Sequence, residues 1–190
     1  MTVGASARRA AFWALDAARG GRIRRNLDDI RSIMDGTGVP SERLEPLLEH
    51  AIRTTPFYSD VRRPHLDAFP IITRALLQRQ PEALHSITYA DVPVRKATTS
   101  GSSGRPVTIR QDRGKRLRSI ADTIYVNETC GQLVGDPLLW IKAWGPADSK
   151  AGLVRRAQNV TTFEVRGLDD ERMLRIVDTL RERPINAMLA

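Results

Sequence analysis

Hydroxyl-bearing residues and glycines gather in one short segment, which reads Thr-Ser-Gly-Ser-Ser-Gly-Arg-Pro from residue 99 to residue 106. Gly101 and Gly104 can adopt positive φ angles and let a ligand approach the backbone, while the hydroxyls and successive N–H groups can donate to phosphate oxygens. Arg105 adds a permanent positive charge whose planar fork matches a phosphate group. The segment therefore predicts a phosphate-binding loop formed by Thr99, Ser100, Gly101, Ser102, Ser103, Gly104 and Arg105.

Two other interpretations of this segment are an ordinary surface turn and a Walker A loop. Composition alone favours an ordinary surface turn, because Ser, Gly and Thr are common in loops. A Walker A loop is excluded, because the Gly-Lys-Ser/Thr ending is absent and the flanking segments look like strands. Residues 107–110 alternate as a strand does, and residues 86–94 are rich in β-branched and aromatic side chains. We therefore expect the loop to connect two antiparallel strands of a hairpin, with its tip exposed to solvent.

Helices are expected before the loop. Residues 8–35 have helical spacing, with Asn26 as an N-cap, and the Gly-Thr-Gly of residues 36–38 ends the pattern. Ser41 is expected to cap a second helix, which Pro56 breaks, and Thr73 a short third one over residues 74–80. In the second helix the apolar side chains fall at i, i+3, i+4, i+7 and i+8, which predicts a core face of Leu44, Leu47, Leu48, Ala51 and Ile52.

After the loop, helical and strand patterns alternate. Residues 113–130 return to helical spacing and end at Gly131. Residues 137–144 contain consecutive apolar side chains, as a buried strand does, and residues 160–165 are a second expected strand. Asp169 is expected to cap a last helix that carries Met173, Ile176, Val177 and Leu180 on one face. The fold class is therefore α/β, with N-terminal helices followed by the start of a sheet.

The order of residues in the loop resembles the Thr/Ser-Ser-Gly-Ser/Thr-Thr/Ser-Gly-x-Pro loop of the adenylate-forming superfamily. Residues 48–61, with His50, Pro56, Phe57 and Tyr58, resemble the "hA...vPfYrd" segment of phenylacetate-CoA ligases and the related CapK-like proteins. Residues 69–77 resemble their "fPiltKaxl" segment, with Arg74 where Lys is usual, and residues 168–190 are similar to a following helix and strand. The chain thus resembles the N-terminal portion of that family, most strongly over residues 44–110.

The resemblance implies a helical lead-in over residues 1–40 and a partial, incomplete ligase N-terminal domain over residues 41–190. In this family a carboxylate attacks the α-phosphate of ATP and displaces pyrophosphate, and the CoA thiolate then displaces AMP from the resulting acyl-adenylate. ATP, Mg²⁺ and CoA are the implied cofactors and substrates, with residues 99–105 on the β- and γ-phosphates. The family's adenine segment, ribose-binding Asp and adenylation Lys have no counterpart here, so the resemblance assigns no catalytic residue. We expect a fragment or truncated ligase, inactive alone, that a separately encoded C-terminal part could complete.

Charge and composition allow two alternatives. A net charge of +8 suits a nucleic-acid-binding module, but 22 acidic residues are interspersed and only 5% of the residues are aromatic, which disfavours it. A non-catalytic remnant that binds a partner protein is the other alternative. The single Cys130 and the scattered His50, His65 and His85 have no metal-ligand spacing, and Cys130 is expected to be at least half-buried. No stretch reaches the roughly 18–20 apolar residues of a membrane span. Because Asp16 and the charges of residues 19–25 also leave no signal-peptide core after the short apolar run of residues 10–15, we expect a cytoplasmic protein.

Overall fold

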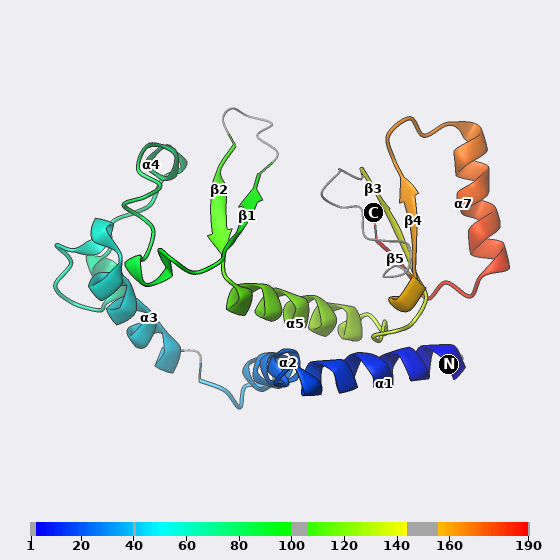
Figure 1. The fold of residues 1–190 in the computed structure, drawn as a ribbon, viewed down its shortest axis with the longest axis horizontal. Helices are drawn as coiled ribbons and strands as arrows, with labels where there is room; N and C mark the ends of the chain where they lie inside the picture. The colour runs from blue at the N-terminus through cyan, green and yellow to red at the C-terminus, as the bar shows by residue number, and fades with distance from the viewer. Residues whose placement is uncertain (1–2, 40, 100–105, 144–155, 190) are drawn as a thin grey trace. The chain divides into compact units, whose positions relative to one another are not determined.

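The computed structural model describes residues 3–39, 41–99, 106–143 and 156–189, and these residues form a mixed α/β structure (Figure 1). The chain divides into two compact units. Residues 1–27 and 121–190 form the first, and residues 28–120 form the second. The first unit contains a three-stranded sheet and the second a two-stranded one. The boundary expected after residue 40 stays a prediction.

A parallel sheet forms the centre of the first unit, with β3 (Leu138–Lys142), β4 (Val160–Glu164) and β5 (Ala187–Leu189) in the order β4-β3-β5. Leu138 pairs with Val160 on one side and with Ala187 on the other. Leu139, on the central strand, is fully buried, as expected for a strand flanked on both sides. The strands expected over residues 137–144 and 160–165 are therefore confirmed within the described residues.

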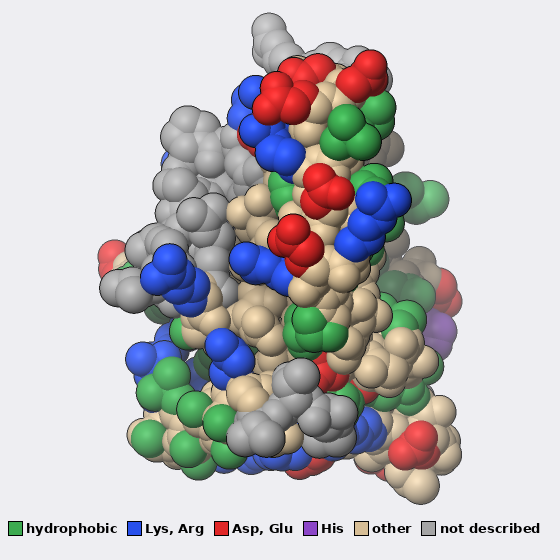
Figure 2. All heavy atoms as spheres, turned by 90° about the vertical axis from the view of Figure 1, so that its right-hand side faces the viewer, with side chains coloured by type: hydrophobic (Ala, Val, Ile, Leu, Met, Phe, Trp, Pro, Cys, Tyr) green, Lys and Arg blue, Asp and Glu red, His purple; other side chains and the backbone are tan. Residues whose placement is uncertain are grey.

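The helix α7 (Asp170–Glu182) carries the chain from β4 to β5 across β3, because parallel strands need a crossover connection. The Oδ1 atom of Asp169 accepts a hydrogen bond from the backbone N–H of Arg172 at 2.8 Å, which confirms the expected N-cap. The expected apolar face is incompletely covered, since Ile176 is half-buried while Met173, Val177 and Leu180 are exposed. Figure 2 shows acidic, basic and hydrophobic side chains interspersed on the side of the molecule where α7 lies.

Two helices, α1 (Val3–Ala18) and α2 (Arg22–Met34), replace the single helix expected over residues 8–35. Gly20 and Gly21 adopt φ angles of 97° and 62° between them. The buried carboxylate of Asp16 accepts hydrogen bonds from the N–H groups of Ile23 and Arg24, at 3.1 and 2.9 Å. The N-cap role predicted for Asn26 is therefore wrong, because Asp16 supplies the cap from the end of α1.

The helix α5 (Arg113–Thr129) follows the expected pattern and ends before Gly131, whose φ is 78°. Cys130 is exposed, so the prediction of a buried or half-buried thiol is wrong. It lies in the turn just past the last helical residue, and its neighbours Thr129 and Gly131 are exposed as well. No helix among the described residues is both long enough and apolar enough to cross a membrane.

The second unit contains α3 (Ser41–Thr54), α4 (Arg74–Arg79) and the hairpin of β1 (Arg95–Thr98) and β2 (Thr108–Gln111). Short 3-10 helices cover Pro56–Tyr58, Leu66–Ala68 and Ile87–Tyr89. The predicted cap of α4 is confirmed, since the Leu76 N–H donates to Thr73 Oγ1 at 3.3 Å. The strand expected over residues 86–94 is wrong. That segment holds a 3-10 turn, and the strand begins only after Pro93, which lacks the N–H that a ladder requires.

The burial of α3 differs from the expected stripe. Leu48 is buried and Ile52 and Ala51 are half-buried, but Leu44 and Leu47 are 41% and 62% exposed. The prediction that Leu44 and Leu47 belong to the core face is therefore wrong. The buried part of α3 is its C-terminal half. There Ser86 Oγ donates to Thr54 Oγ1 at 2.9 Å, and the 3-10 helix Pro56–Tyr58 follows.

Candidate functional site: the β1–β2 hairpin

The strands on either side of the predicted phosphate loop pair with one another. β1 and β2 are antiparallel, in a register that runs from Arg95 opposite Gln111 to Thr98 opposite Thr108 (Figure 1). This confirms that the loop connects two antiparallel strands. Residues 100–105 lie outside the described residues, so the exposure of the loop tip stays a prediction, and of the predicted site residues only Thr99 can be placed.

Thr99 closes the base of the loop. Its backbone N–H donates to the carbonyl oxygen of Val107 at 3.0 Å, and the Val107 N–H donates to Thr99 Oγ1 at 3.1 Å. Val107 is buried, so its N–H needs a protein partner, and the Thr99 hydroxyl provides it. A hydroxyl has one proton and two lone pairs, so the Thr99 O–H can still donate to a ligand.

Side chains on a hairpin alternate between its two faces, and the register assigns Lys96, Thr98, Thr108 and Arg110 to one of them. We call this the polar face. The hydroxyls of Thr98 and Thr108 lie 3.0 Å apart at its loop end, and Lys96 is directly opposite Arg110. The other face carries Arg95, Ala97, Ile109 and Gln111. The polar face therefore presents two cations and two hydroxyls next to the loop.

Two cations directly opposite one another repel, which favours an anion near them. Arg110 is already ion-paired with Glu82, and its Nη1 atom lies 3.4 Å from His85 Nδ1. Glu82 is exposed, so water screens this pair and a phosphate could compete for the guanidinium. The polar face can bind an anion and offers no group for covalent chemistry.

Sequence reasoning missed Lys96, Thr108 and Arg110 as candidate site residues. Their common face follows from the register, and the first strand was expected one segment too early, over residues 86–94. Residues 95–98, Arg-Lys-Ala-Thr, have no hydrophobic alternation that would have revealed the strand. The usable signal was Pro93, after which a strand can start.

A carboxylate in the same unit illustrates a purely structural ion cluster. Asp29, in α2, accepts hydrogen bonds from Arg43 of α3, at 2.7 Å for Nη1 to Oδ2, and from Arg118 of α5. These hydrogen bonds, from Arg43 first and then Arg118, hold the pKa of Asp29 well below its usual range. A carboxylate so weakly basic cannot serve as a general base near neutral pH.

His50, His65 and Tyr58 make packing or surface contacts. His50 is half-buried and makes an edge contact with Tyr89, with ring centroids 6.5 Å apart, and the exposed His65 Nδ1 lies 2.7 Å from Asp67 Oδ1. Tyr58 packs against Phe57 and Phe69, at centroid distances of 5.4 and 5.0 Å. Burial raises the pKa of the Tyr58 hydroxyl.

Metal ligands are the next question for the polar face. Within the part of the chain that the structure describes, no three or more His, Cys, Asp or Glu side chains gather as a metal site. Mg²⁺ prefers oxygen ligands such as carboxylates, whereas the polar face offers cations and hydroxyls. The four residues of the polar face therefore include no carboxylate that could bind Mg²⁺.

Neither the models of known protein families nor the curated proteins match this sequence. The hairpin and its polar face are therefore the basis on which a function is proposed.

Proposed function

We propose that this chain is the phosphate-binding part of an AMP-forming acyl- or aryl-CoA ligase of the phenylacetate-CoA ligase type, an N-terminal fragment or truncated form that is inactive alone. The observation that carries the proposal is the hairpin. Residues 99–105, whose order resembles the ligase loop, join two antiparallel strands whose polar face carries Lys96, Arg110 and two threonine hydroxyls.

The proposed role is electrostatic. When the acid attacks the α-phosphate of ATP, negative charge builds up on the departing pyrophosphate, and fixed donors and cations around it lower the energy of that state. Thr99 has its backbone fixed by Val107 and a free O–H proton, and Arg105 adds a cation at the loop's end. Lys96 extends the positive charge down the polar face. CoA and a small carboxylic acid complete the proposed substrates.

The proposal predicts a difference between the two faces of one strand. Titration calorimetry with tripolyphosphate, which reproduces the phosphates without the nucleoside, is expected to give an affinity about three- to tenfold lower for Lys96→Gln, because a hydrogen-bonded charge is lost at a partly screened site. Arg105→Ala is expected to lower it at least as much.

Arg95→Gln is the matched control, because it removes one positive charge from the neighbouring position on the opposite face. Its affinity is expected to stay within about twofold of the unmutated chain, since only long-range charge is lost. Equal losses for Lys96→Gln and Arg95→Gln would mean that net charge, rather than the polar face, attracts the phosphates.

A further inference from the structure

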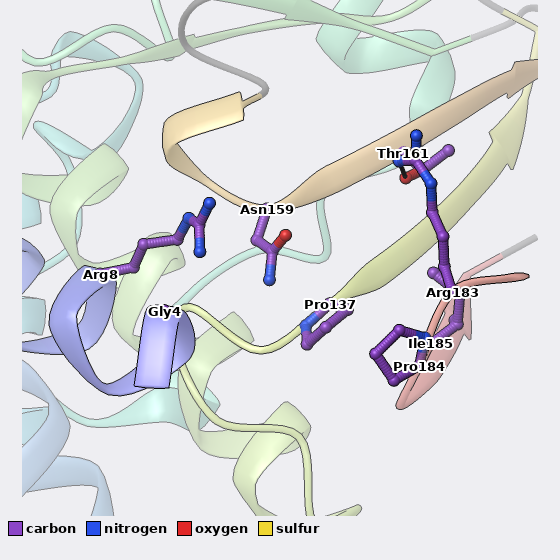
Figure 3. Close-up of a pocket in the computed structure, with 8 residues that line it drawn as sticks. All are labelled: Gly4, Arg8, Pro137, Asn159, Thr161, Arg183, Pro184 and Ile185. Carbon is purple, nitrogen blue, oxygen red and sulfur yellow. Dashed lines mark hydrogen bonds between the residues drawn. The ribbon is translucent and has the colours of Figure 1, made fainter. Parts of the chain in front are cut away.

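A pocket of about 290 Å³ lies in the first unit, at the amino ends of the three parallel strands. Pro137 precedes β3, Asn159 precedes β4 and Ile185 lies just before β5, and Gly4 and Arg8 of α1 also line the pocket (Figure 3). All the described residues that line this pocket belong to the first unit, whereas Thr99 and the polar face belong to the second, so the pocket is a separate candidate site.

The walls of the pocket are held by contacts between α1 and the segment before β3. Arg9 of α1 pairs with the buried Asp136, at 3.0 Å from Nη2 to Oδ1, and its Nε donates to the Val134 carbonyl oxygen at 3.1 Å. Asn159, at a φ of 57°, donates from Nδ2 to the Gly135 carbonyl oxygen at 2.9 Å. These bonds fix the approach of α1 to the strand ends, so the pocket exists before any ligand arrives.

The two charged side chains described in the lining, Arg8 and Arg183, are both positive. Figure 3 shows Arg8 and Arg183 on different sides of the pocket, and no carboxylate is among the described residues that line it. Arg183 Nη1 donates to Thr161 Oγ1 at 3.2 Å, which orients the guanidinium and leaves its other N–H groups available. Gly4 lies in the first turn of α1, so the positive end of that helix dipole adds to the two cations.

The remaining lining is apolar, from Pro137, Pro184 and Ile185. A pocket of this size lies at the lower end of the roughly 300–1,000 Å³ usual for ligand sites, and it is larger than an inorganic anion needs. We propose that it binds a small organic anion, with a carboxylate or phosphate group between Arg8 and Arg183 and a ring-sized apolar body against Pro184 and Ile185. This site does not depend on the proposed ligase activity, because binding alone reveals it.

The test is an NMR titration of the whole ¹⁵N-labelled chain with benzoate, phenyl phosphate and benzyl alcohol, which share a ring and differ in charge. Benzoate or phenyl phosphate is expected to shift the backbone amide of Gly4 and the side-chain amide of Asn159, and benzyl alcohol is expected to bind at least about tenfold more weakly. The ranking of the two anions identifies which charged group the guanidiniums prefer.

Arg8→Gln and Arg183→Gln are each expected to lower the affinity for the better-bound anion about three- to tenfold, because both side chains are exposed and their charges are partly screened. Arg175→Gln is the control, because it removes the same charge from α7 at a position that does not line the pocket. Arg8→Lys and Arg183→Lys, which keep the charge, are expected to bind better than the Gln variants, and circular dichroism verifies that each variant is folded.

Two results would overturn the proposal. Benzyl alcohol that binds as tightly as benzoate would remove the role of charge, and pocket variants that bind like Arg175→Gln would remove Arg8 and Arg183 from the site.

Discussion

At the scale of single residues, Thr99 combines a structural and a proposed binding role. Its oxygen accepts from the N–H of buried Val107, and its own proton is free for a phosphate. Thr99→Val keeps the shape of the side chain but leaves that N–H without its acceptor. We expect the free energy of unfolding to fall by about 1–2 kcal/mol, measured by urea denaturation, because a buried donor becomes unsatisfied.

Thr99→Ser retains the oxygen and is expected to lose less stability than Thr99→Val. Thr98→Val is the second comparison, since the Thr98 hydroxyl pairs only with that of Thr108 on an exposed face. A Thr99→Val variant as stable as Thr99→Ser would show that the hydroxyl does not close the loop.

Asp29 gives a pH-dependent prediction. Hydrogen bonds from Arg43 and Arg118 hold its pKa well below the value of about 3.9 expected in the unfolded chain. Between the two values the unfolded state binds more protons, so the stabilisation is fully present above about pH 5 and is lost as the pH falls toward the folded-state pKa. Asp29→Asn is expected to cost about 1 kcal/mol at pH 7 and progressively less below pH 4, measured by urea denaturation at each pH.

Asp28→Asn is the matched control for this variant, because Asp28 is exposed and makes only a 3.3 Å pair with Arg31 of the same helix. Its effect is expected to be within a few tenths of a kcal/mol at every pH. An Asp29→Asn penalty that does not change between pH 7 and pH 3 would contradict the ion-cluster explanation.

At the scale of elements, α3 is stabilised through one side chain more than through its apolar stripe. Leu48 is 8% exposed and Leu47, its neighbour in sequence, is 62% exposed. Leu48→Ala is therefore expected to cost about 2–4 kcal/mol by the loss of buried methyl groups and the cavity left behind, whereas Leu47→Ala should cost about 0.5 kcal/mol or less. Thermal denaturation that gives similar losses for both variants would contradict the orientation of α3.

Gly135 fixes the approach of α1 to the segment before β3. Its φ is 89°, and an added Cβ would lie 2.7 Å from the Ala5 carbonyl oxygen and 3.0 Å from the Arg9 nitrogen. Gly20 has a similar φ of 97° but open space around it. Gly135→Ala and Gly20→Ala both force a residue with a Cβ into a positive φ, so this backbone penalty cancels in the comparison. Only Gly135→Ala also overpacks, and we therefore expect its free energy of unfolding, measured by urea denaturation, to fall by at least about 1 kcal/mol more than that of Gly20→Ala. Equal costs would place α1 elsewhere.

Capping signals that act locally were predictable from the sequence. Thr73 and Asp169 cap the helices that start immediately after them, and Gly131 follows the end of α5, because each signal lies within a few residues of the bond that it makes. The cap of α2 was not predictable in this way. Asp16 reaches it from the preceding helix, across a turn that two glycines permit.

Periodicity predicted which residues share a face but could not predict how much of that face is covered. Leu44 and Leu48 lie on the same side of α3, yet only Leu48 is buried, because burial depends on what the rest of the unit places against the helix. The candidate site was likewise predictable only in its local part. The sequence indicated a loop between strands, whereas the pairing of Lys96 with Arg110 required the register.

At the scale of the whole molecule, the proposed function predicts binding without turnover. Pyrophosphate release from ATP, Mg²⁺, CoA and phenylacetate is expected to stay at the background rate for this chain alone. The reason is that the polar face and loop would contact phosphates only, so the binding energy that drives the chemical step at the adenine, ribose and acid is missing. Steady release above background that scales with the concentration of the chain would contradict the fragment hypothesis.

The central claim, that the hairpin binds nucleotide phosphates, is tested most directly by an NMR titration of the whole chain with tripolyphosphate and, separately, with adenosine. We expect tripolyphosphate to shift the backbone amides of Thr99, Val107 and Thr108, which border the loop, and adenosine to leave them unchanged, because the proposed contacts involve phosphate alone. Tripolyphosphate that leaves these amides unchanged at millimolar concentration, or that shifts only Gly4 and Asn159 in the first unit, would contradict the claim.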